Sequence, residues 1–321
     1  MRVLVVGASG AIGRRLIPQL TERGHQVTGT SRSAAGAGQL RALGAEPAVL
    51  DVLDEGAVRA VVGQARPDAV IYQATALTGV SFSRNMDRTF APTNELRTRG
   101  TDILLAAVRE AGVPRFIGQS FAPFRYAHAG GPVKDEDDPL VAAPPPSARL
   151  SFGAMAHVDT AVTAAGGIAL RYGGFYGEQG DARVKAVRKR QFPLIGDGGG
   201  IMSFIHLEDA AAATVLALDA EGPAVFNVTD DEPAPMRDWL PALAAAVGAR
   251  PPYRLPGWVG ALALGKTLTV MTEARGASNA KAKRELGWVL RYPSWRAGFP
   301  AAYGRQAPRS GAARTGGSRA V

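Results

Sequence analysis

Short apolar runs alternate with longer segments of helical periodicity over the first 120 residues. The apolar runs predict strands at Arg2–Val6, Gln26–Thr30, Glu46–Leu50, Ala69–Tyr72 and Arg115–Gly118. The segments between them predict helices or parts of helices at Ala11–Arg23, Gln39–Leu43, Glu55–Gln64 and Asn94–Ala111. Strands that alternate with helices form βαβ units with right-handed crossovers. The pattern therefore predicts an α/β fold built on a doubly wound parallel sheet.

The second half of the chain has a looser pattern. A long segment rich in Pro, Gly and acidic residues, 121–150, precedes further predicted elements, and long loops in compact folds often carry function. The predicted helices are Leu150–Ala164, Leu207–Leu218, Met236–Val247, Gly257–Thr272 and Ala280–Leu286, and the strands are Gly167–Arg171, Ser203–His206 and Val225–Val228. We expect a nucleotide-binding domain over 1–175 with loop 121–150 above its site, and a smaller substrate-binding region over 176–305. We also expect a return to the first domain near 203–230 and a disordered tail over 306–321.

Three glycines follow the first strand directly, in Gly7-Ala8-Ser9-Gly10-Ala11-Ile12-Gly13. This G-x-x-G-x-x-G spacing lets main-chain N–H groups approach a diphosphate, and the following helix adds the positive end of its dipole. A glycine triplet between a strand and a helix predicts a Rossmann dinucleotide-binding domain. The cofactor contacts would come from Gly7, Ser9, Gly10, Ala11, Ile12 and Gly13.

The end of the second strand favours NADP over NAD. An acidic residue there binds the ribose 2′-hydroxyl of NAD, whereas an arginine suits the 2′-phosphate of NADP. This strand ends in Ser31 and Arg32 without a carboxylate. Arg14 and Arg15, just after the last glycine, are further candidates for phosphate contact. An ordinary surface role for Arg32 is the alternative interpretation.

Composition narrows the class of protein. The chain has no cysteine, which excludes disulfides and thiolate chemistry, and no His/Asp/Glu grouping has metal-site spacing, so we expect no metal. No apolar run is long enough for a membrane span or a signal peptide, and we expect a cytoplasmic protein. The net charge of +9 is concentrated in Arg183–Arg190 and in the tail. We interpret it as solvated surface rather than a nucleic-acid interface, and a homodimer is left open.

Several further segments resemble the short-chain dehydrogenase/reductase superfamily, in particular its extended NAD-dependent epimerase/dehydratase branch. The similar segments are Asp51-Val52, Tyr72-Gln73-Ala74-Thr75-Ala76, Arg99–Leu105, Leu170–Gly177 and Ser203–Ala211. The resemblance implies that Asp51 and Val52 contact adenine. It also places Gln73, Ala74 and Thr75 beside the cofactor. Tyr172 either lines the nicotinamide pocket or simply packs.

The chain departs from this family where the chemistry is done. Active members carry a Tyr and a Lys four residues apart on the helix after the fifth strand, and no Y-x-x-x-K lies between Ser120 and Arg171. Alignment on Asp159 puts Ser151 at the Tyr position and Met155 at the Lys position. Neither side chain can perform that acid–base chemistry.

Other residues near the carboxyl end of the fifth strand are candidate replacements, because ligands of doubly wound sheets bind there. Ser120 is a candidate hydrogen-bond donor to a substrate carbonyl, and Tyr126 and His128 are candidate proton-transfer groups. Structural alternatives are a packed aromatic for Tyr126 and a solvated loop residue for His128.

Three functions are compatible with these features. The leading hypothesis is an atypical NADP-dependent oxidoreductase or epimerase/dehydratase-like enzyme that acts on a carbonyl, hydroxyl or activated double bond of a small organic molecule. The missing Tyr and Lys leave two alternatives open. One is a non-redox cyclase, lyase or isomerase on the same fold, and the other is a non-catalytic NADP-sensing protein.

Overall fold

The computed structural model describes residues 1–77, 83–178 and 181–304. Its centre is a seven-stranded sheet in which all paired strands are parallel, in the order β12-β7-β5-β4-β1-β2-β3. The strands are β1 (Arg2–Val6), β2 (Gln26–Ser31), β3 (Glu46–Val49), β4 (Ala69–Tyr72), β5 (Arg115–Phe121), β7 (Ile168–Tyr172) and β12 (Ala224–Val228). The order reverses between β1 and β4, which is where a doubly wound sheet opens a crevice for ligands.

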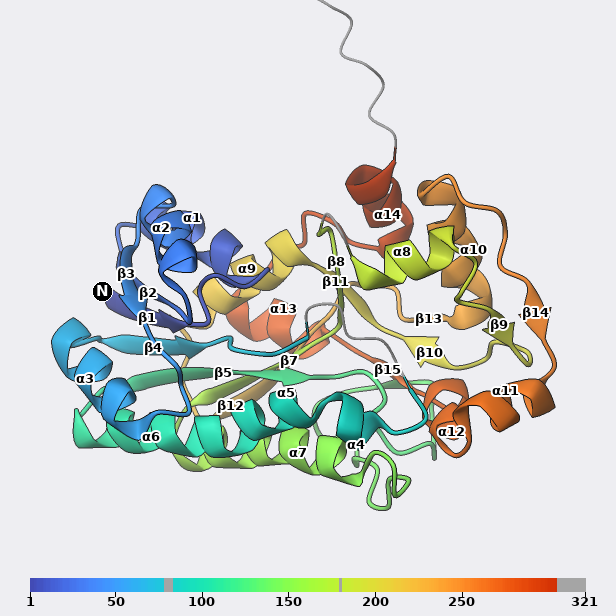
Figure 1. Cartoon of the computed structure of the whole chain (residues 1–321), viewed down its shortest axis with the longest axis horizontal. Helices are drawn as coiled ribbons and strands as arrows, with labels where there is room; N and C mark the ends of the chain where they lie inside the picture. Colours follow the sequence, from blue (N-terminus) through green and yellow to red (C-terminus); the bar gives the residue numbers. More distant parts are fainter. Residues whose placement is uncertain (78–82, 179–180, 305–321) are drawn as a thin grey trace, which may run out of the picture.

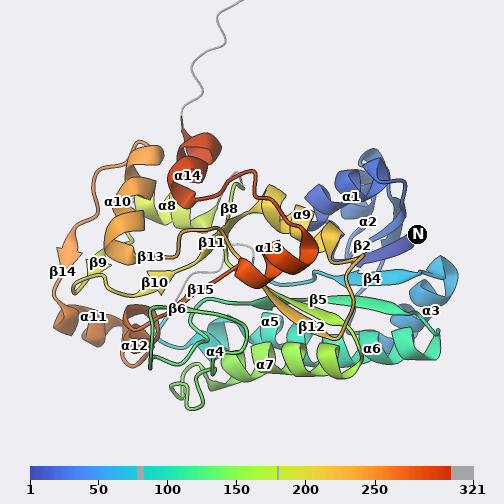
Figure 2. The ribbon, with the colours of Figure 1, turned by 180° about the vertical axis from the view of Figure 1, so that it is seen from behind.

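Helices cover both faces of this sheet (Figure 1). One face carries α1 (Gly13–Glu22), α2 (Ala34–Ala42), α9 (Leu207–Leu216) and α13 (Ala280–Leu286). In α1, Leu16, Ile17 and Leu20 are fully buried, which is the one-sided spacing of an amphipathic helix. Seen from behind, α13 lies near α9 and the edge strand β12 (Figure 2). A segment beyond residue 203 thus contributes a strand and two helices to the sheet layer.

The opposite face carries α3 (Glu55–Ala65), α6 (Thr101–Glu110) and α7 (Arg149–Ala164), packed on a second apolar core. The expected continuous helix Asn94–Ala111 is irregular. It consists of α5 (Ala91–Glu95), a π-helical turn η1 (Leu96–Gly100) and α6, preceded by α4 (Met86–Thr89). A Cβ on Gly100 would lie 2.5 Å from Oη of Tyr72, which donates to the Leu96 carbonyl of η1, so a larger residue there would displace this hydroxyl. Such π-turns are often found at functional sites.

The second region lies beyond the carboxyl ends of the strands (Figure 1). It contains α8 (Ala182–Arg188), α10 (Met236–Ala246), α11 (Gly257–Leu264), α12 (Thr267–Thr272) and α14 (Trp295–Tyr303), with the short strands β8 (Gly174–Tyr176), β9 (Leu194–Ile195), β10 (Ile201–Met202), β11 (Phe204–His206), β13 (Ala234–Pro235) and β14 (Arg254–Leu255). The expected helix Gly257–Thr272 is broken at Gly265, whose φ is +56°. Helix α14 was not predicted, although it buries Trp295 and Phe299 in the core of this region.

Parts of loop 121–150 form β-type pairings. Strand β6 (Val133–Lys134) pairs in parallel with β15 (Gly276–Ala277), and Tyr126 forms an isolated bridge with Leu140.

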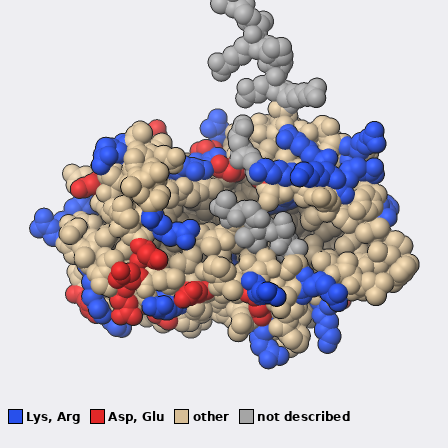
Figure 3. All heavy atoms as spheres, in the orientation of Figure 1, with Lys and Arg blue, Asp and Glu red and all other residues tan. Residues whose placement is uncertain are grey.

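Basic side chains gather around α8 in Figure 3, where Arg183, Lys185, Arg188, Lys189 and Arg190 lie. The expected disordered tail, 306–321, lies outside the described residues. Within the described part of the chain, no helix combines the length and apolarity needed to cross a bilayer.

Candidate active site

A cavity of about 940 Å³ runs along the carboxyl edge of the sheet into the second region. Figure 3 shows the molecule hollowed on this face between the two parts. The sheet side supplies the glycine loop and the residues that follow β2, β3, β4 and β5, and the far wall is made by the second region. The predicted cofactor residues that line it are Gly7, Ser9, Gly10, Ala11, Ile12, Gly13, Ser31, Arg32, Asp51, Val52, Gln73, Ala74 and Thr75. Its volume falls within the range of ligand pockets.

The glycine loop has the shape that a dinucleotide requires. Gly7 has φ +85°, and a Cβ there would lie 2.6 Å from the main-chain nitrogen of Ala74. A Cβ on Gly13 would lie 2.4 Å from the carbonyl oxygen of Ala8, so the start of α1 packs directly on the loop. The N-cap residue Ile12 gives no side-chain hydrogen bond to the first turn of α1. The N–H groups of Ala11, Ile12 and Gly13 donate to no described residue, and unpaired N–H groups where a helix begins suit a diphosphate.

The residues after β2 and β3 form the other end of the sheet side. Ser31 is buried, whereas Arg32 is exposed and makes no hydrogen bond or ion pair with any described residue. Helix α2 begins beside it, with Ser33 as its N-cap accepting a hydrogen bond from the Gly36 N–H. Asp51 Oδ1 accepts a hydrogen bond from the Leu53 N–H at 3.0 Å and so fixes the turn after β3. A free guanidinium next to a helix N-terminus suits a phosphate.

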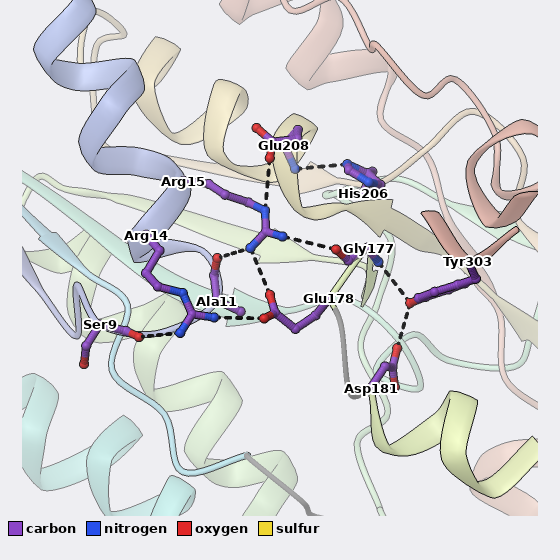
Figure 4. A network of polar contacts seen from close by, with 10 residues as sticks. All are labelled: Ser9, Ala11, Arg14, Arg15, Gly177, Glu178, Asp181, His206, Glu208 and Tyr303. Carbon is purple, nitrogen blue, oxygen red and sulfur yellow. Dashed lines mark hydrogen bonds and ion pairs between the residues drawn. The ribbon is translucent and has the colours of Figure 1, made fainter. Parts of the chain in front are cut away.

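Arg14 and Arg15, the further candidates for phosphate contact, both form ion pairs. Arg14 Nη2 and Arg15 Nη1 each lie 2.9 Å from a carboxylate oxygen of Glu178, and Arg15 Nε donates to Glu208 Oε1 at 3.1 Å (Figure 4). Arg14 and Glu178 line the cavity, whereas Arg15 does not. These ion pairs tie the first turns of α1 to the segment after β8. The sequence could not reveal them because Glu178 lies 164 residues from Arg14.

The C-terminal helix reaches the same network. Tyr303 Oη donates to Asp181 Oδ2 at 3.0 Å and accepts from the Gly177 N–H at 3.0 Å (Figure 4). Burial raises the pKa of Tyr303 above its ordinary value, so the hydroxyl is a hydrogen-bonding group rather than an acid. Gly177 and Asp181 are therefore both held by the side chain of Tyr303.

Tyr172 packs behind the cavity and does not line it. Its hydroxyl accepts from Gln73 Nε2 at 3.0 Å and lies 2.6 Å from Thr214 Oγ1, and the side chain has no exposed surface. Burial raises the pKa of Tyr172 to about 12. Of its two interpretations, the structure favours packing. Gln73 itself lines the cavity, so Tyr172 holds a lining residue in place.

The three candidate catalytic residues are also placed away from the cavity lining. Ser120 is fully buried and accepts from Arg125 Nη1 at 3.1 Å. Tyr126 is fully buried as well, and its hydroxyl donates to Asn227 Oδ1 at 2.7 Å. The ring of His128 lies 2.8 Å from a carboxylate oxygen of Glu273. Side chains after a strand end turn inward or outward according to packing, which sequence spacing does not reveal.

Helix α7 lines the cavity with Ser151, Phe152 and Met155, and it contains neither Tyr nor Lys. Ser151 Oγ donates to Asp87 Oδ1 at 2.8 Å and accepts from Asn94 Nδ2 at 3.1 Å. The Asp87 carboxylate also accepts the Leu150 and Ser151 N–H groups, so it caps the start of α7. Ser151 thus connects three helices at the cavity edge.

Arg97 is a cavity residue that sequence reasoning missed. It lies on η1, is 7% exposed, and its Nε has no hydrogen-bond partner. Burial lowers the pKa of Arg97 to about 10, and the nearby charge of Arg125 adds to this effect. A basic residue on the apolar face of a predicted helix was the available signal. The remaining inner walls are largely apolar and aromatic, with Phe90, Phe121, Phe124, Phe152, Phe175, Tyr176, Phe192 and Trp239.

Comparison with known proteins identifies the family. The sequence profile of the NAD dependent epimerase/dehydratase family matches residues 3–229. The chain belongs to this family. The membership confirms the predicted α/β Rossmann fold and the expectation of an enzyme.

Two curated relatives of this epimerase/dehydratase-family chain are reductases. A 3-diazoavenalumate denitrifying reductase from Streptomyces sp is 42% identical over 308 residues, which cover 93% of this chain and 99% of the relative. A 2-alkyl-3-oxoalkanoate reductase from Stenotrophomonas maltophilia is 30% identical over 277 residues, which cover 78% of this chain and 76% of the relative.

Solved structures agree on the fold. The UDP-glucose 4-epimerase of Thermotoga maritima, solved with UDP-glucose, superposes with a TM-score of 0.76 at 20% identity over 94% of this chain and 97% of its own. A dTDP-glucose 4,6-dehydratase of Streptomyces venezuelae, solved with NAD, gives a TM-score of 0.73 at 20% identity over 94% and 96%. At such identities the likeness concerns the fold alone.

Proposed function

We propose that this chain is an NADP-dependent reductase of a small, planar organic substrate, and that it replaces an aryl diazonium group by hydrogen. The observation that carries the proposal is a cavity lined by the glycine loop, whose α7 wall presents Ser151 and Met155 instead of a proton-donating pair. The relative that shares 42% of its residues is named as a denitrifying reductase of a diazo compound. The family and the curated reductases support the wider class of small-molecule oxidoreductases.

Different residues of the cavity would bind different parts of the cofactor. The loop Gly7–Gly13 and the first turn of α1 would hold the diphosphate, and Asp51 and Val52 would flank the adenine. Arg32, free and beside the N-terminus of α2, would hold the 2′-phosphate, which supports NADP over NAD. The cofactor supplies a hydride when it is bound.

The demand for a proton distinguishes the candidate reactions. Reduction of a ketone leaves an alkoxide that must receive a proton from the protein or from water. Replacement of a diazonium group by hydrogen forms one C–H bond with the hydride and breaks the C–N bond. Dinitrogen departs with the electron pair of that bond, and no oxygen anion is left to protonate. A site without a Tyr–Lys pair is adequate for this second reaction.

The cavity then has to orient the substrate and exclude water. Its aromatic walls suit a planar molecule, and the stacking of rings against such walls fixes orientation. Phe121 ends β5, Phe124 comes from the loop after it, and Phe152 comes from α7, and all three line the cavity. An enclosed apolar surface also protects a reactive diazo group from hydrolysis.

Turnover of a matched pair of substrates tests the proposal. One substrate is an aromatic carboxylate with a diazonium group on the ring, and the other carries an acetyl group, which is a ketone, at the same position. We expect NADPH oxidation, loss of the diazo chromophore and dinitrogen release in equal amounts, with slow or no reaction of the ketone. NADPH that carries deuterium in place of the transferred hydrogen should label the product carbon. Fast ketone reduction with an inert diazo compound would refute the proposal, and tighter binding of NADH than NADPH would refute the cofactor assignment.

A further inference from the structure

The guanidinium of Arg97 lines the cavity without a direct counter-ion among the described residues. It makes no hydrogen bond or ion pair with any residue that the structure describes, and its Nε is buried without a partner. With 7% of the residue exposed, little solvent reaches it. An ionised group that has lost its hydration without gaining a partner is costly. The cavity is the side from which a partner can arrive.

The charges around Arg97 do not neutralise it. Asp159 Oδ2 lies 2.8 Å from Arg125 Nη1 and 2.9 Å from Arg171 Nε, so two guanidinium groups already share this carboxylate. Both arginines are buried. Arg97 interacts with Asp159 and Arg125 only through space, and Tyr72 is the other titratable group beside it. Three buried guanidinium groups therefore face one aspartate, and the cluster has a surplus of positive charge.

A glutamate farther along the cluster does not remove that surplus. Glu136 lies beside Arg171, whose Nη1 donates to the Glu136 main-chain oxygen at 3.5 Å. The Glu136 carboxylate accepts the Asn227 N–H at 2.6 Å, and burial raises its pKa. This carboxylate is thus engaged on the side of Arg171 and does not pair with Arg97.

The shape of the Arg97 guanidinium and its position in the cavity indicate which chemical group would bind it. A guanidinium presents a planar fork of N–H groups that matches a carboxylate. The phosphates of the cofactor belong at the other end of the cavity, by the loop after β1 and by Arg32 after β2, whereas Arg97 follows β4 and lies against α7. Leu96, Phe152 and Met155 provide apolar surface in the same cavity. A flat molecule that ends in a carboxylate satisfies both features.

We propose that Arg97 is the binding site for the carboxylate of the substrate. This inference rests on the proposed function for the substrate's identity, but binding by itself tests it. The name of the reductase that shares 42% identity also denotes a carboxylate. Arg97 is then the residue that selects acids over neutral molecules of the same shape.

Calorimetric titration of the full chain with cinnamate and with cinnamamide, with and without NADP⁺, tests the inference. The variants are R97M, R97K and the control R99M. Arg99 lies on the same turn but is 56% exposed, pairs with Glu95 and donates to the Leu53 carbonyl. We expect R97M to weaken cinnamate binding at least about tenfold, as for a lost charge-assisted hydrogen bond. Cinnamamide binding should be weak and unchanged, and R99M should behave like the natural chain.

Two further measurements keep the result interpretable. Because Arg97 is a buried charge without a partner, R97M should be at least as stable to heat as the natural chain, which excludes misfolding as a cause of weak binding. R97K keeps the charge but loses the fork, and we expect it to bind cinnamate less tightly than the natural chain and more tightly than R97M. If R97M loses the binding of cinnamate and of cinnamamide equally, the proposal is overturned.

The titration with NADP⁺ distinguishes a substrate carboxylate from a cofactor phosphate as the anion that Arg97 binds. We expect equal NADP⁺ affinity in R97M and the natural chain. If R97M loses NADP⁺ and keeps cinnamate, the anion bound by Arg97 is a cofactor phosphate and the inference fails. A chain that binds cinnamate through Arg97 but reduces no diazo compound supports the inference and removes the proposed function. A chain that reduces diazo acids and diazo amides equally well does the opposite.

Discussion

Asn94 Nδ2 donates a hydrogen bond of 3.1 Å to Ser151 Oγ, which joins α5 to α7 at the edge of the cavity. Both side chains are buried, and the Ser151 hydroxyl in turn donates a hydrogen bond to Asp87 Oδ1 at 2.8 Å. The hydroxyl is therefore used in both directions by the protein itself. Ser151 connects helices in this arrangement, and the proposed reaction does not require it to donate a proton to the substrate.

The substitution S151A should lower stability. It leaves the Asn94 amide without its acceptor and Asp87 without one of its three donors. A buried polar group left unpaired costs about 1–3 kcal/mol, and we expect the free energy of unfolding to fall by that amount. Urea denaturation measures it. An unchanged midpoint and slope would show that the connection carries no energy.

Arg32 should distinguish the two cofactors. In R32A, NADPH affinity should fall about 10- to 100-fold, because a charge-assisted contact to the 2′-phosphate is lost. NADH affinity should not change, since NADH has no phosphate at that position. Fluorescence titration of both cofactors provides the measurement. R41A, at the exposed far end of α2, is the matched control, and an equal loss for both cofactors would contradict the assignment.

The variant E178Q should bind the cofactor more tightly. Glu178 occupies both Arg14 and Arg15 at 2.9 Å beside the loop that would hold the diphosphate, and it adds a negative charge to the cavity. Its neutralisation frees the arginines. Half-exposed ion pairs are worth about 0.2–1 kcal/mol, so we expect a gain of about two- to fivefold that shrinks with added salt.

The control for E178Q is E110Q. Glu110 Oε2 lies 3.0 Å from Arg59 Nε, a pair of similar length between exposed side chains that do not line the cavity. Neither variant should change the free energy of unfolding by more than about 1 kcal/mol. Weaker cofactor binding in E178Q would mean that Glu178 orients the arginines rather than competing for them.

Asp230 should make stability fall with rising pH. The side chain is 1% exposed with Oδ2 unpartnered, and burial raises its pKa to about 8 from 3.8. Between these values the folded chain holds a proton that the unfolded chain has released. Its contribution to stability is present below pH 3.8 and is lost as the pH rises through about 8. The slope reaches at most about 1.4 kcal/mol per pH unit.

The variant D230N removes this titration. Its stability should decline less between pH 5 and pH 8 than that of the natural chain, which lies inside the window set by the pKa of about 8. Chemical denaturation at several pH values measures the difference. D197N is the control, because the Asp197 side chain is 82% exposed. Parallel pH profiles for D230N and the natural chain would contradict the assignment.

The periodicity of the sequence determined the elements of the sheet layer. Strands at Arg2–Val6 and Ala69–Tyr72 and the helix Ala280–Leu286 coincide with the predicted bounds. The glycine loop was also readable, because its function depends on local backbone geometry: Gly7 must adopt a positive φ, and Gly13 must pack on Ala8. Local interactions of this kind are determined by residues that are close together in the sequence.

Only the tertiary structure decided which side chains face the cavity. It turned Tyr126 into the core, paired Arg14 with Glu178 across 164 residues, and placed Arg97 on a π-turn without a partner. Helix α14 likewise became recognisable through its long-range packing on α10. Orientation and charge pairing depend on groups that are distant in sequence, and no spacing along one chain fixes how those groups meet.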